Sequence, residues 1–265
     1  MVEPLDPSEL SEAIALFERA GLAGAATSVA RYLRWQPDGA WRVRIGGALA
    51  GTVTLLRHGH IGFVGCMAVD EAHRSRGLGR RLLEHAHAAG RRAGITTFLL
   101  EATAAGRPLY DKLGYVDEYE TWNVARPVTA PVTASEPLRD LGAERAAILA
   151  LDQRATGSRR DAMIGGLIAE HRGAVVHGDT LAGYGIVVDG RLGPVVARDP
   201  VAGRALIDRL APFASFATVP VPNEAAMAAF AANGFTPLRS LRRMRLGPAI
   251  PTPGWLWSLA SPGAG

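Results

Sequence analysis

The sequence has very few of the residues that mark disulfide-linked, metal-binding or membrane-spanning proteins. Its 265 residues include one cysteine, Cys66, and one lysine, Lys112. A single cysteine excludes an intrachain disulfide and any metal site built from several cysteines, and we expect no metal cofactor. The longest nearly apolar run, residues 61–69, is far too short to cross a bilayer, so we expect no membrane partner. The first ten residues are acidic and lack the basic-then-apolar pattern of a signal peptide, and we therefore predict a cytoplasmic protein.

Positive charge comes almost wholly from arginine. Lysine and arginine together number 29 against 25 acidic residues, which gives a formal net charge of +4. Arginine binds phosphates and carboxylates well, which favours an anionic partner, while the base composition of the genome explains the same excess without any function. The sequence has no dense basic run interleaved with aromatic residues, so we expect no nucleic-acid partner.

The same order of predicted elements occurs twice along the chain. Each half contains two helices, three strands, a helix, a strand, a helix and a strand, as judged from hydrophobic periodicity and turn residues. This self-similarity indicates two related α/β domains, although an unrelated second domain is the alternative. We expect Ser8 to cap the first helix. In the first half the predicted helices cover 5–21, a segment ending near 35, 77–93 and 107–114, and the predicted strands are two within 41–56 and those over 61–69, 95–103 and 115–124. In the second half the predicted helices cover 142–155, 158–170, 202–213 and 223–234, and the predicted strands cover 174–177, 180–188, 191–197, 215–221 and 235–246.

A proline-rich stretch separates the two halves. The run "ARPVTAPVTASEP" carries three prolines among small polar residues and has no apolar period, which is typical of a linker. We therefore predict domains over residues 1–127 and 138–265, joined by a linker over 128–137. A local echo supports two related halves, since "LYDKLGYV" and "AFAANGFT" both place one aromatic residue four positions before a glycine and another directly after it. Any helix that ends at glycine before a strand can produce this spacing.

The run "VDEAHRSRGLGRRLLEHA", residues 69–86, places glycines and positive charges where a predicted strand gives way to a helix. A helix N-terminus presents unpaired backbone N–H groups with partial positive charge, and glycine lets a ligand approach them closely. The run therefore suits an anion, and its arginines suit a diphosphate, while a glycine-rich loop with solvated arginines is the alternative. Neither the NTPase-loop pattern nor the three-glycine dinucleotide pattern is present. The arginines are Arg74, Arg76, Arg80 and Arg81.

The segment "RSRGLG" within this run matches the [QR]-x-x-G-x-[GA] signature of the GNAT superfamily of acyl-CoA-dependent N-acetyltransferases. The later segment "LEATAAGRPLYDKLGYV" is similar to the next conserved segment of that family, a strand followed by a tyrosine-bearing helix. The resemblance covers most of residues 1–125, and the second half resembles a degenerate copy. It implies two tandem GNAT-like domains, each a mostly antiparallel mixed sheet flanked by helices.

The resemblance also implies that acetyl-CoA is the acyl donor, and it assigns candidate binding residues. The family pairs the pantetheine arm with the end of the fourth strand, which corresponds here to Met67, Ala68 and Val69. A tyrosine on the short helix lies by the thioester sulfur, which corresponds to Tyr110. Seven residues earlier the family often has asparagine, where this chain has Thr103, another hydrogen-bonding side chain. The pyrophosphate loop corresponds to Arg74, Ser75, Arg76, Gly77, Leu78, Gly79 and Arg80.

Acetyl transfer to an amine needs a base, an oxyanion donor and an acid. A lysine-like amine is neutral in only about one molecule in a thousand near pH 7, so a base or a water chain must take its proton. Glu101, late on its strand, is the candidate base, although a carboxylate paired with an arginine fits the same position. A backbone N–H on the fourth strand is the candidate oxyanion donor. Tyr110 is the candidate acid for the leaving thiolate, and packing under the helix is its alternative role.

The other polar and aromatic residues carry weaker indications. Cys66 is expected to be a small buried core residue. The tail is expected to cover a domain surface and bury its two tryptophans. The residues expected to be solvated at turns or on the surface are His58, His60, Asp152, His171 and His177. The alternative for Asp152, His171 and His177 is a place at an acceptor site. The tail tryptophans are Trp255 and Trp257, and a lid on a substrate cleft is the alternative role of the tail.

These observations predict an acetyl-CoA-dependent N-acetyltransferase. We expect the first domain to bind acetyl-CoA and to transfer the acetyl group directly to a primary amine of a small molecule or peptide. The second domain is expected to shape the acceptor site or to stabilise the first. The alternative is a non-enzymatic acyl-CoA-binding sensor or scaffold on the same fold. The second half has Phe230 where the first has Tyr110, and it keeps only one glycine of the pair, so we expect one cofactor site per chain.

Overall fold

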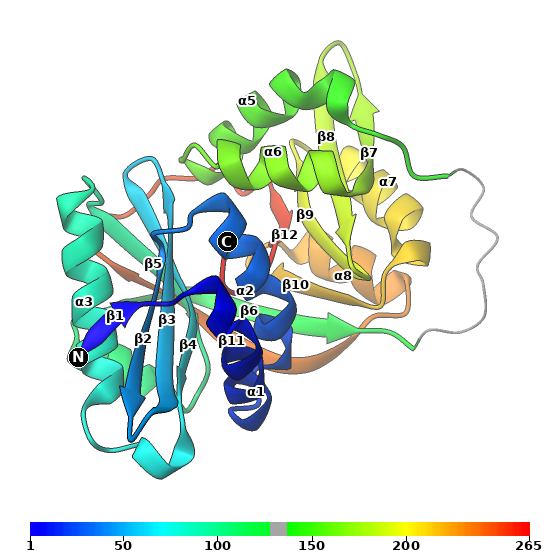
Figure 1. The fold of residues 1–265 in the computed structure, drawn as a ribbon. Helices are drawn as coiled ribbons and strands as arrows, with labels where there is room; N and C mark the ends of the chain where they lie inside the picture. The colour runs from blue at the N-terminus through cyan, green and yellow to red at the C-terminus, as the bar shows by residue number, and fades with distance from the viewer. Residues whose placement is uncertain (128–136) are drawn as a thin grey trace. The chain divides into compact units, whose positions relative to one another are not determined.

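The computed structural model describes residues 1–127 and 137–265 (Figure 1). The predicted linker, 128–137, lies outside these residues except for its last position. Within the described ranges, no helix is long and apolar enough to cross a bilayer. The elements in chain order are β1 (Val2–Pro4), η1 (Pro7–Glu9), α1 (Leu10–Arg19), α2 (Ala23–Trp35), β2 (Ala40–Ile45), β3 (Ala48–His58), β4 (Ile61–Val69), η2 (Glu71–His73), α3 (Leu78–Arg92), β5 (Thr97–Ala102), α4 (Arg107–Lys112), β6 (Val116–Ala125), η3 (Gly142–Glu144), α5 (Arg145–Thr156), α6 (Asp161–Glu170), β7 (Arg172–His177), β8 (Leu181–Val188), β9 (Arg191–Ala197), α7 (Pro200–Leu210), η4 (Ala211–Phe213), β10 (Phe216–Pro220), α8 (Glu224–Ala232), β11 (Thr236–Leu246) and β12 (Leu256–Ser258).

The contacts between residues divide the chain into two compact units, and both units take segments from both halves of the sequence. The division falls within β6, earlier than the linker in which the sequence places the domain boundary. That serial boundary stays a prediction, because 128–136 lie outside the described residues. The first unit comprises Met1–Asp117, Met244–Ala249 and Gly263–Gly265, and the second comprises Glu118–Arg243 and Ile250–Pro262.

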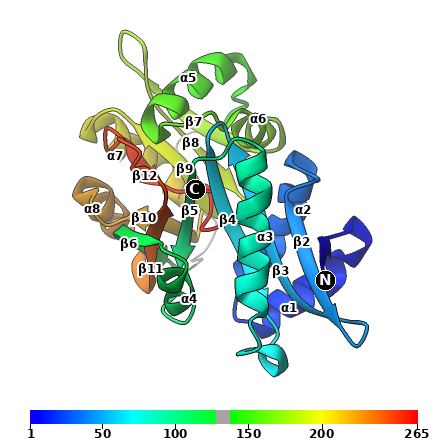
Figure 2. The ribbon, with the colours of Figure 1, turned by 90° about the vertical axis from the view of Figure 1, so that its left-hand side faces the viewer.

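The first unit contains a mixed sheet. Strands β1, β2, β3 and β4 pair antiparallel in that order, β5 pairs parallel to β4, and the end of β11 lies beside β5. Gly46 and Gly47, at φ 57° and 82°, make the predicted turn between β2 and β3. Helix α3 covers one face of these strands, and α1 and α2 cover the other (Figures 1 and 2).

The core of the first unit lies between the sheet and α3. The apolar stripe of α3 includes Leu78, Leu82 and Ala86, all buried, as the helical spacing of the sequence predicts. Met244, from the end of β11, is fully buried in the same cluster. The first unit therefore depends on a residue from the far end of the chain, which no local sequence pattern indicates.

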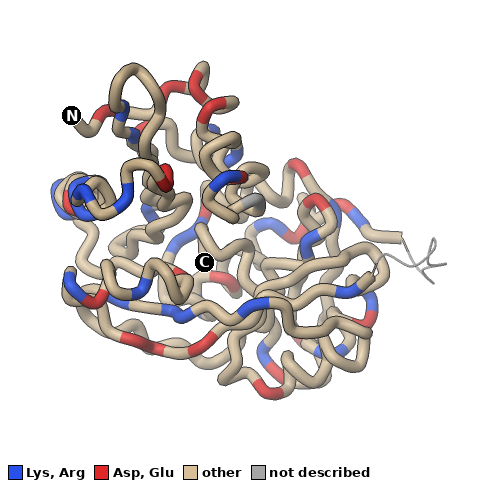
Figure 3. Tube along the Cα trace, turned by 90° about the horizontal axis from the view of Figure 1, so that it is seen from below, with Lys and Arg blue, Asp and Glu red and all other residues tan. Residues whose placement is uncertain are grey.

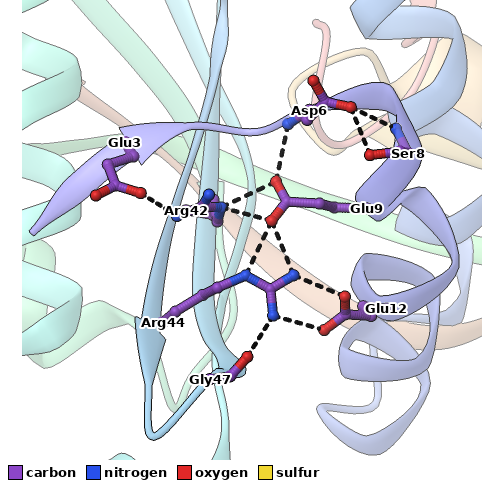
Figure 4. Close-up of polar contacts among 8 residues, drawn as sticks. All are labelled: Glu3, Asp6, Ser8, Glu9, Glu12, Arg42, Arg44 and Gly47. Carbon is purple, nitrogen blue, oxygen red and sulfur yellow. Dashed lines mark hydrogen bonds and ion pairs between the residues drawn. The ribbon is translucent and has the colours of Figure 1, made fainter.

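Helix α1 is joined to the sheet by an ion network (Figure 4). Glu9 accepts from the Nε atoms of Arg42 and Arg44, both at 2.9 Å, and Arg44 also pairs with Glu12 at 2.6 Å. Burial raises the pKa of Glu9, but the hydrogen bonds from Arg42 and Asp6 outweigh burial and hold the pKa below its usual value. The prediction that Ser8 caps the first helix is wrong. Asp6 caps the short helix η1, and its carboxylate accepts from the Ser8 N–H at 2.8 Å. Helix α1 follows directly, with Glu9 at its N-cap position and no hydrogen bond there from a capping side chain of the described residues.

The second unit has the same kind of mixed sheet. Its strands follow the order β11, β6, β10, β9, β8 and β7, with β12 paired to β9. The pairs β7–β8, β8–β9 and β6–β10 are antiparallel, and β9–β10 is parallel. Residues from α7 and α8 fill the core against this sheet. The predicted fold class, two mixed α/β units with mostly antiparallel sheets, is confirmed.

Asp152 is not a surface residue, which corrects the sequence expectation. It is 1% exposed, and its carboxylate accepts from Arg160 Nη2 and from the Tyr184 hydroxyl, each at 2.5 Å. Arg160 is 3% exposed, so the pair is a buried ion pair inside the second unit, and removal of one partner would leave an uncompensated charge. His177 is exposed as expected, with Nε2 3.3 Å from Glu144. Asp152 therefore has a structural role.

Candidate functional site

The start of α3 leaves its first backbone amides without a capping side chain. Gly77 occupies the N-cap position at φ 74°, and none of the described side chains caps the helix there. A Cβ at Gly77 would have nothing within 4 Å, so the space in front of the helix is open. Ser75 also has positive φ, 61°, which turns the loop sharply just before the helix. This geometry suits an anion that accepts hydrogen bonds from the first turn.

Exposed arginines surround this helix start. Arg74, Arg76, Arg80 and Arg81 are all exposed to solvent. Arg74 Nε donates to the Val69 carbonyl at 3.3 Å, and Arg80 Nε lies 2.7 Å from Glu84. Elsewhere along the trace, basic and acidic residues are interspersed (Figure 3). The positive charge at α3 therefore adds locally to the partial charge of the helix end.

Strands β4 and β5 stop pairing well before β4 ends. Their parallel ladder joins Ile61–Phe63 to Thr97–Leu99, whereas β4 continues to Val69 and β5 to Ala102. Beyond the ladder, none of the strands within residues 1–127 and 137–265 pairs with β4 on the side toward β5, so an extended group could bind there. The predicted pantetheine contacts Met67, Ala68 and Val69 lie on this part of β4.

A β-bulge lies at the point where the strands part. Thr52 of β3 faces Ala68 and Thr54 faces Gly65, so two residues of β4, starting with Cys66, face one residue of β3. Cys66 has φ 44°, and its carbonyl accepts from Thr52 Oγ1 at 2.9 Å. Bulges re-aim backbone groups at the edge of a ladder, so this one turns the end of β4 away from regular pairing.

The start of α3, the end of β4 and helix α4 meet at Gly79. A Cβ at Gly79 would lie 3.0 Å from Leu109 Cδ2 and 3.1 Å from Met67 Cε. Glycine at this position lets the three elements pack together. The structure thus brings together the predicted diphosphate loop, the predicted pantetheine strand and the helix that carries Tyr110.

Tyr110 lies buried beside Thr103. A Cβ at Gly106 would lie 3.1 Å from Tyr110 Cε2 and 3.4 Å from Thr103 Oγ1, which places the two side chains at one spot. Thr103 Oγ1 accepts from the Gly106 N–H at 3.2 Å. Burial raises the pKa of Tyr110 to about 12, so its hydroxyl keeps its proton at neutral pH.

The sequence did not identify His87 and Tyr115 as parts of this site. The Tyr115 ring meets the Tyr110 ring edge-on at 5.7 Å, and its hydroxyl lies 2.8 Å from His87 Nε2. Burial lowers the pKa of His87 to about 4 and raises that of Tyr115. The aromatic echo around Gly114 is the sequence signal that marks Tyr115.

Four further residues singled out from the sequence occupy different environments. Glu101 is half-buried on β5, two residues before Thr103, as the sequence predicts. Cys66 is buried, and burial raises the pKa of its thiol to about 12. His58 is 5% exposed with Nε2 3.3 Å from the Ala264 carbonyl oxygen, so the expectation that it is solvated is wrong, whereas His60 is exposed.

The equivalent helix of the second unit is capped by its own chain. Asp199 is the N-cap of α7, and its carboxylate accepts from the N–H groups of Val201 and Ala202, both at 2.9 Å. The amides that α3 leaves open are therefore bonded to a negative charge at α7. Asp199 followed by proline at the start of an apolar helix is a sequence signal for such a cap.

Strand β12 lies between β9 and β10, the pair equivalent to β4 and β5. The ladder of β9 and β10 covers Arg191–Leu192 and Phe216–Ala217, and β12 pairs antiparallel with β9 beyond it. Ser258 Oγ donates to the Leu192 carbonyl at 2.7 Å, and the Leu259 N–H donates to the Thr218 carbonyl at 2.9 Å. The chain itself thus occupies the strand edge that stays available in the first unit.

Aromatic residues complete the closure of the second unit. Trp257 of β12 is 3% exposed, as the expected burial of the tail requires, and a Cβ at Gly203 of α7 would lie 2.1 Å from its ring. Trp255 is half-buried under Arg154, whose guanidinium lies 5.2 Å from its ring centroid. Phe230 corresponds to Tyr110 and carries no hydroxyl.

Both halves of the chain match family models with the same description. A model described as "Acetyltransferase (GNAT) domain" matches residues 36–117, and a second model with that description matches residues 148–254. Together these matches cover more than half of the chain. No curated protein matches the sequence significantly.

Several crystal structures share the fold at low sequence identity. A proposed acetyltransferase from Pyrococcus horikoshii is 22% identical with a TM-score of 0.88, and the match covers 100% of this chain and 95% of that one. A GCN5-related N-acetyltransferase from Sphaerobacter thermophilus is 18% identical, with a TM-score of 0.67 and coverage of 96% and 98%. A tandem GNAT protein from the clavulanic acid biosynthesis pathway is 18% identical, with a TM-score of 0.60 and coverage of 94% and 99%.

Proposed function

The chain belongs to the GNAT acetyltransferase family and is an acyl-CoA-dependent acetyltransferase. From this premise we propose that its first unit transfers an acetyl group from acetyl-CoA directly to a primary amine. The observation that carries the proposal is the meeting of three features at Gly79. These are an uncapped helix start, a strand edge without a neighbour and the helix that bears a protonated tyrosine. The acceptor class is a small-molecule or peptide amine.

The residues of the first unit fit acetyl-CoA. The amides at the start of α3, with the loop from Arg74 to Arg80, would hold the diphosphate, since open space and positive charge lie in front of the helix. The backbone of Met67–Val69 would pair with the amides of the pantetheine arm. Thr103, beside Tyr110, would border the thioester. Acetyl-CoA supplies the activated acetyl thioester.

Direct transfer is favoured by the state of the lone cysteine. A cysteine nucleophile needs a thiolate, and burial raises the pKa of Cys66 to about 12, which keeps it protonated. The acceptor amine therefore attacks the acetyl carbon itself and forms the C–N bond as the C–S bond breaks. In this proposal a backbone N–H near the bulge of β4 would stabilise the charge that develops on the carbonyl oxygen.

Tyr110 donates a proton to the leaving sulfur in this proposal. Its hydroxyl stays protonated at neutral pH because burial raises its pKa to about 12. A thiolate released beside it would take the proton, which prevents the reverse attack. Glu101, late on β5, is the proposed base that removes the amine proton, directly or through water.

The second unit is proposed to bind no acetyl-CoA. Its helix start is bonded to Asp199, its strand edge is filled by β12, and Phe230 replaces the tyrosine. Each of these closes one of the three features that support binding in the first unit. We therefore expect one acetyl-CoA site per chain.

Titration and turnover test the proposal together. Calorimetric titration of the purified full chain with acetyl-CoA should give one site per chain. Thiol release should then follow addition of a primary amine, with the acetylated amine detected by mass spectrometry. Two sites per chain would contradict the closure of the second unit. One bound acetyl-CoA without acetylation of any amine, across small amines and peptides, would contradict the acceptor class.

A further inference from the structure

The segment Gly263–Gly265, which follows β12 in the sequence, belongs to the first unit, where it lies on β4. A Cβ at Gly65 would lie 2.5 Å from the Gly263 carbonyl oxygen and 2.8 Å from its Cα. A Cβ at Gly265 would lie 2.8 Å from the Phe63 ring. Gly263 therefore packs with its backbone directly on the backbone of Gly65, and Gly265 packs on the Phe63 ring. A side chain at Gly65 would force the segment away from the strand.

The segment lies on the face of the sheet that is turned away from α3. Side chains of a strand alternate between faces, and Gly51 of β3 points at Leu82 of α3. Thr54 and His58 of the same strand therefore point to the opposite face. His58 Nε2 lies 3.3 Å from the Ala264 carbonyl oxygen, which places the segment there as well.

Helix α2 contacts the segment from the other side. A Cβ at Gly263 would lie 3.0 Å from the Tyr32 hydroxyl and 3.3 Å from its ring. Tyr32 is 3% exposed, so this contact is internal to the first unit. Gly263 is thus held between β4 and α2, with no spare room for a side chain.

Cys66 is buried on the same face. Thr54 faces Gly65, the residue directly before Cys66, in the ladder of β3 and β4, and Thr54 shares the face of His58. Cys66 is 7% exposed and directly follows Gly65, the residue that Gly263 covers. Because Cys66 is the single cysteine of the chain, the rate at which its thiol is alkylated measures how well the segment 263–265 covers this part of β4.

We infer that Gly263–Gly265 forms the acceptor side of the acetyl-transfer site and limits the bulk of the amine that reaches the thioester. This inference rests on the proposed function. The donor is held from the α3 side of β4, and the nucleophile must approach the acetyl carbon from a direction that the donor leaves open. The face opposite α3, beside the bulge, provides that direction, and the segment covers it. An amine unbranched next to its nitrogen is the expected class of acceptor.

The first test measures how well the segment covers β4, and it needs no acceptor. Iodoacetamide alkylation of Cys66 in the full chain is followed by mass spectrometry. Gly263→Ala pushes a methyl group at the Tyr32 hydroxyl, so Cys66 should react about tenfold faster as the segment opens locally. The double variant Gly263→Ala with Tyr32→Phe removes the clashing oxygen and should return the rate toward that of Tyr32→Phe alone. Gly178→Ala, at an exposed position with open space, is the matched control and should react at the wild-type rate.

Equal alkylation rates for wild type and Gly263→Ala would overturn the inference. So would faster alkylation that Tyr32→Phe does not reverse, because general destabilisation gives that pattern. The specific contact between Gly263 and Tyr32 predicts reversal.

The second test measures acceptor choice with three primary amines of increasing branching, namely ethanolamine, alanine amide and valine amide. We expect wild type to prefer the unbranched amine. Gly263→Ala should change the ratio of kcat/KM between unbranched and branched amines by about fivefold or more. Its affinity for acetyl-CoA should stay within about twofold of wild type, since the donor is held on the other side of β4.

An unchanged ratio in a variant that turns over would overturn the inference and leave the proposed function intact. A wild-type protein that binds one acetyl-CoA and acetylates no amine would overturn the proposed function and, with it, the acceptor role of the segment. The alkylation rates would in that case still decide whether the segment covers β4.

Discussion

The two aromatic pairs at the ends of α4 and α8 show how the units differ. In the first unit, Tyr110 and Tyr115 meet edge-on at 5.7 Å, and the hydroxyl of Tyr115 lies against a buried histidine. In the second, Phe230 and Phe235 meet edge-on at 5.2 Å in an apolar cluster. Both units have the edge-on packing of the two rings, but only the first unit has hydroxyl groups on them. The fold needs the rings, and the proposed chemistry needs the oxygen atoms.

The helix starts and strand edges differ in the same way. Gly77 leaves the amides of α3 open, whereas Asp199 bonds those of α7. The edge of β4 beyond its ladder has no neighbouring strand in the first unit, whereas β12 fills the edge of β9. The second unit satisfies with its own atoms the groups to which we propose that acetyl-CoA binds in the first unit. A site on this fold therefore consists largely of hydrogen bonds that the protein does not make internally.

The largest expected effect comes from Gly79→Glu in the first unit. The substitution places bulk against Leu109 and Met67 and a negative charge at the proposed diphosphate position. Affinity for acetyl-CoA should fall by about a hundredfold or more, measured by calorimetry. Val201→Glu puts the same charge at the second position of α7, which is 80% exposed, and should leave binding unchanged. Normal affinity in a folded Gly79→Glu protein would remove the site from α3.

A pair of variants at Gly77 sharpens the same comparison without crowding the core. Gly77→Asp gives α3 a carboxylate cap like that of α7, and Gly77→Asn gives the same shape without charge. Both residues tolerate positive φ, and a side chain there meets open space. Gly77→Asp should bind acetyl-CoA about tenfold more weakly than Gly77→Asn. Equal affinities would mean that the helix start does not hold an anion.

Tyr110→Phe converts the first aromatic pair to the chemistry of the second. The ring and its packing stay, and the proton donor is lost. We expect kcat to fall by about a hundredfold with acetyl-CoA affinity nearly unchanged, measured in single-turnover experiments where chemistry limits the rate. Tyr115→Phe removes a hydroxyl that bonds His87 and is not assigned to the reaction. If both variants lowered kcat equally, the acid role of Tyr110 would have to be withdrawn.

The buried His87 should make the first unit sensitive to acid. Its pKa is lowered to about 4, whereas an unfolded histidine titrates near 6.5, so the unfolded state binds a proton first as pH falls. Stability should therefore decline between pH 6.5 and 4, by roughly 3 kcal/mol in total. His87→Gln should lose this part of the pH dependence, measured by chemical denaturation at several pH values. The matched control His177→Gln, at an exposed site, should keep it.

The smallest expected effect comes from Asp199→Ala. Loss of the cap of α7 should cost about 1 kcal/mol of stability, measured by denaturation. The number of acetyl-CoA sites should stay at one, because β12 still fills the strand edge. A second site in this variant would show that the cap alone keeps the cofactor out of the second unit.

Local pattern was sufficient to predict most elements and the start of the helix that borders the candidate site. The strand over 61–69 and the helix from Gly77 follow from apolar spacing and from glycine, both properties of adjacent residues. The arginine and glycine spacing located the helix start, and the resemblance to the GNAT family identified Tyr110. The roles of these residues stay predictions until variants are measured.

Features that depend on distant parts of the chain were not predictable. His58 is covered by Ala264, which lies 206 residues later, so its turn-like surroundings in the sequence gave the wrong environment. Asp152 is buried because Arg160 and Tyr184 surround it. Strand β12 has only three residues and no alternating pattern, and it forms because β9 offers an unpaired edge. Burial and pairing of this kind are set by tertiary structure.

The return of β11 to the first unit has an evolutionary consequence. Met244 lies in the core of the first unit, and the Pro248 carbonyl accepts from Thr97 Oγ1 at 2.9 Å. A gene shortened to its first half would thus encode an incomplete sheet and a core with a missing side chain. If the two halves arose by duplication, the second copy could change its cofactor groups, but it could not be deleted without loss of these contacts. We therefore expect descendants of this gene to keep both copies, whatever happens to the cofactor groups of the second.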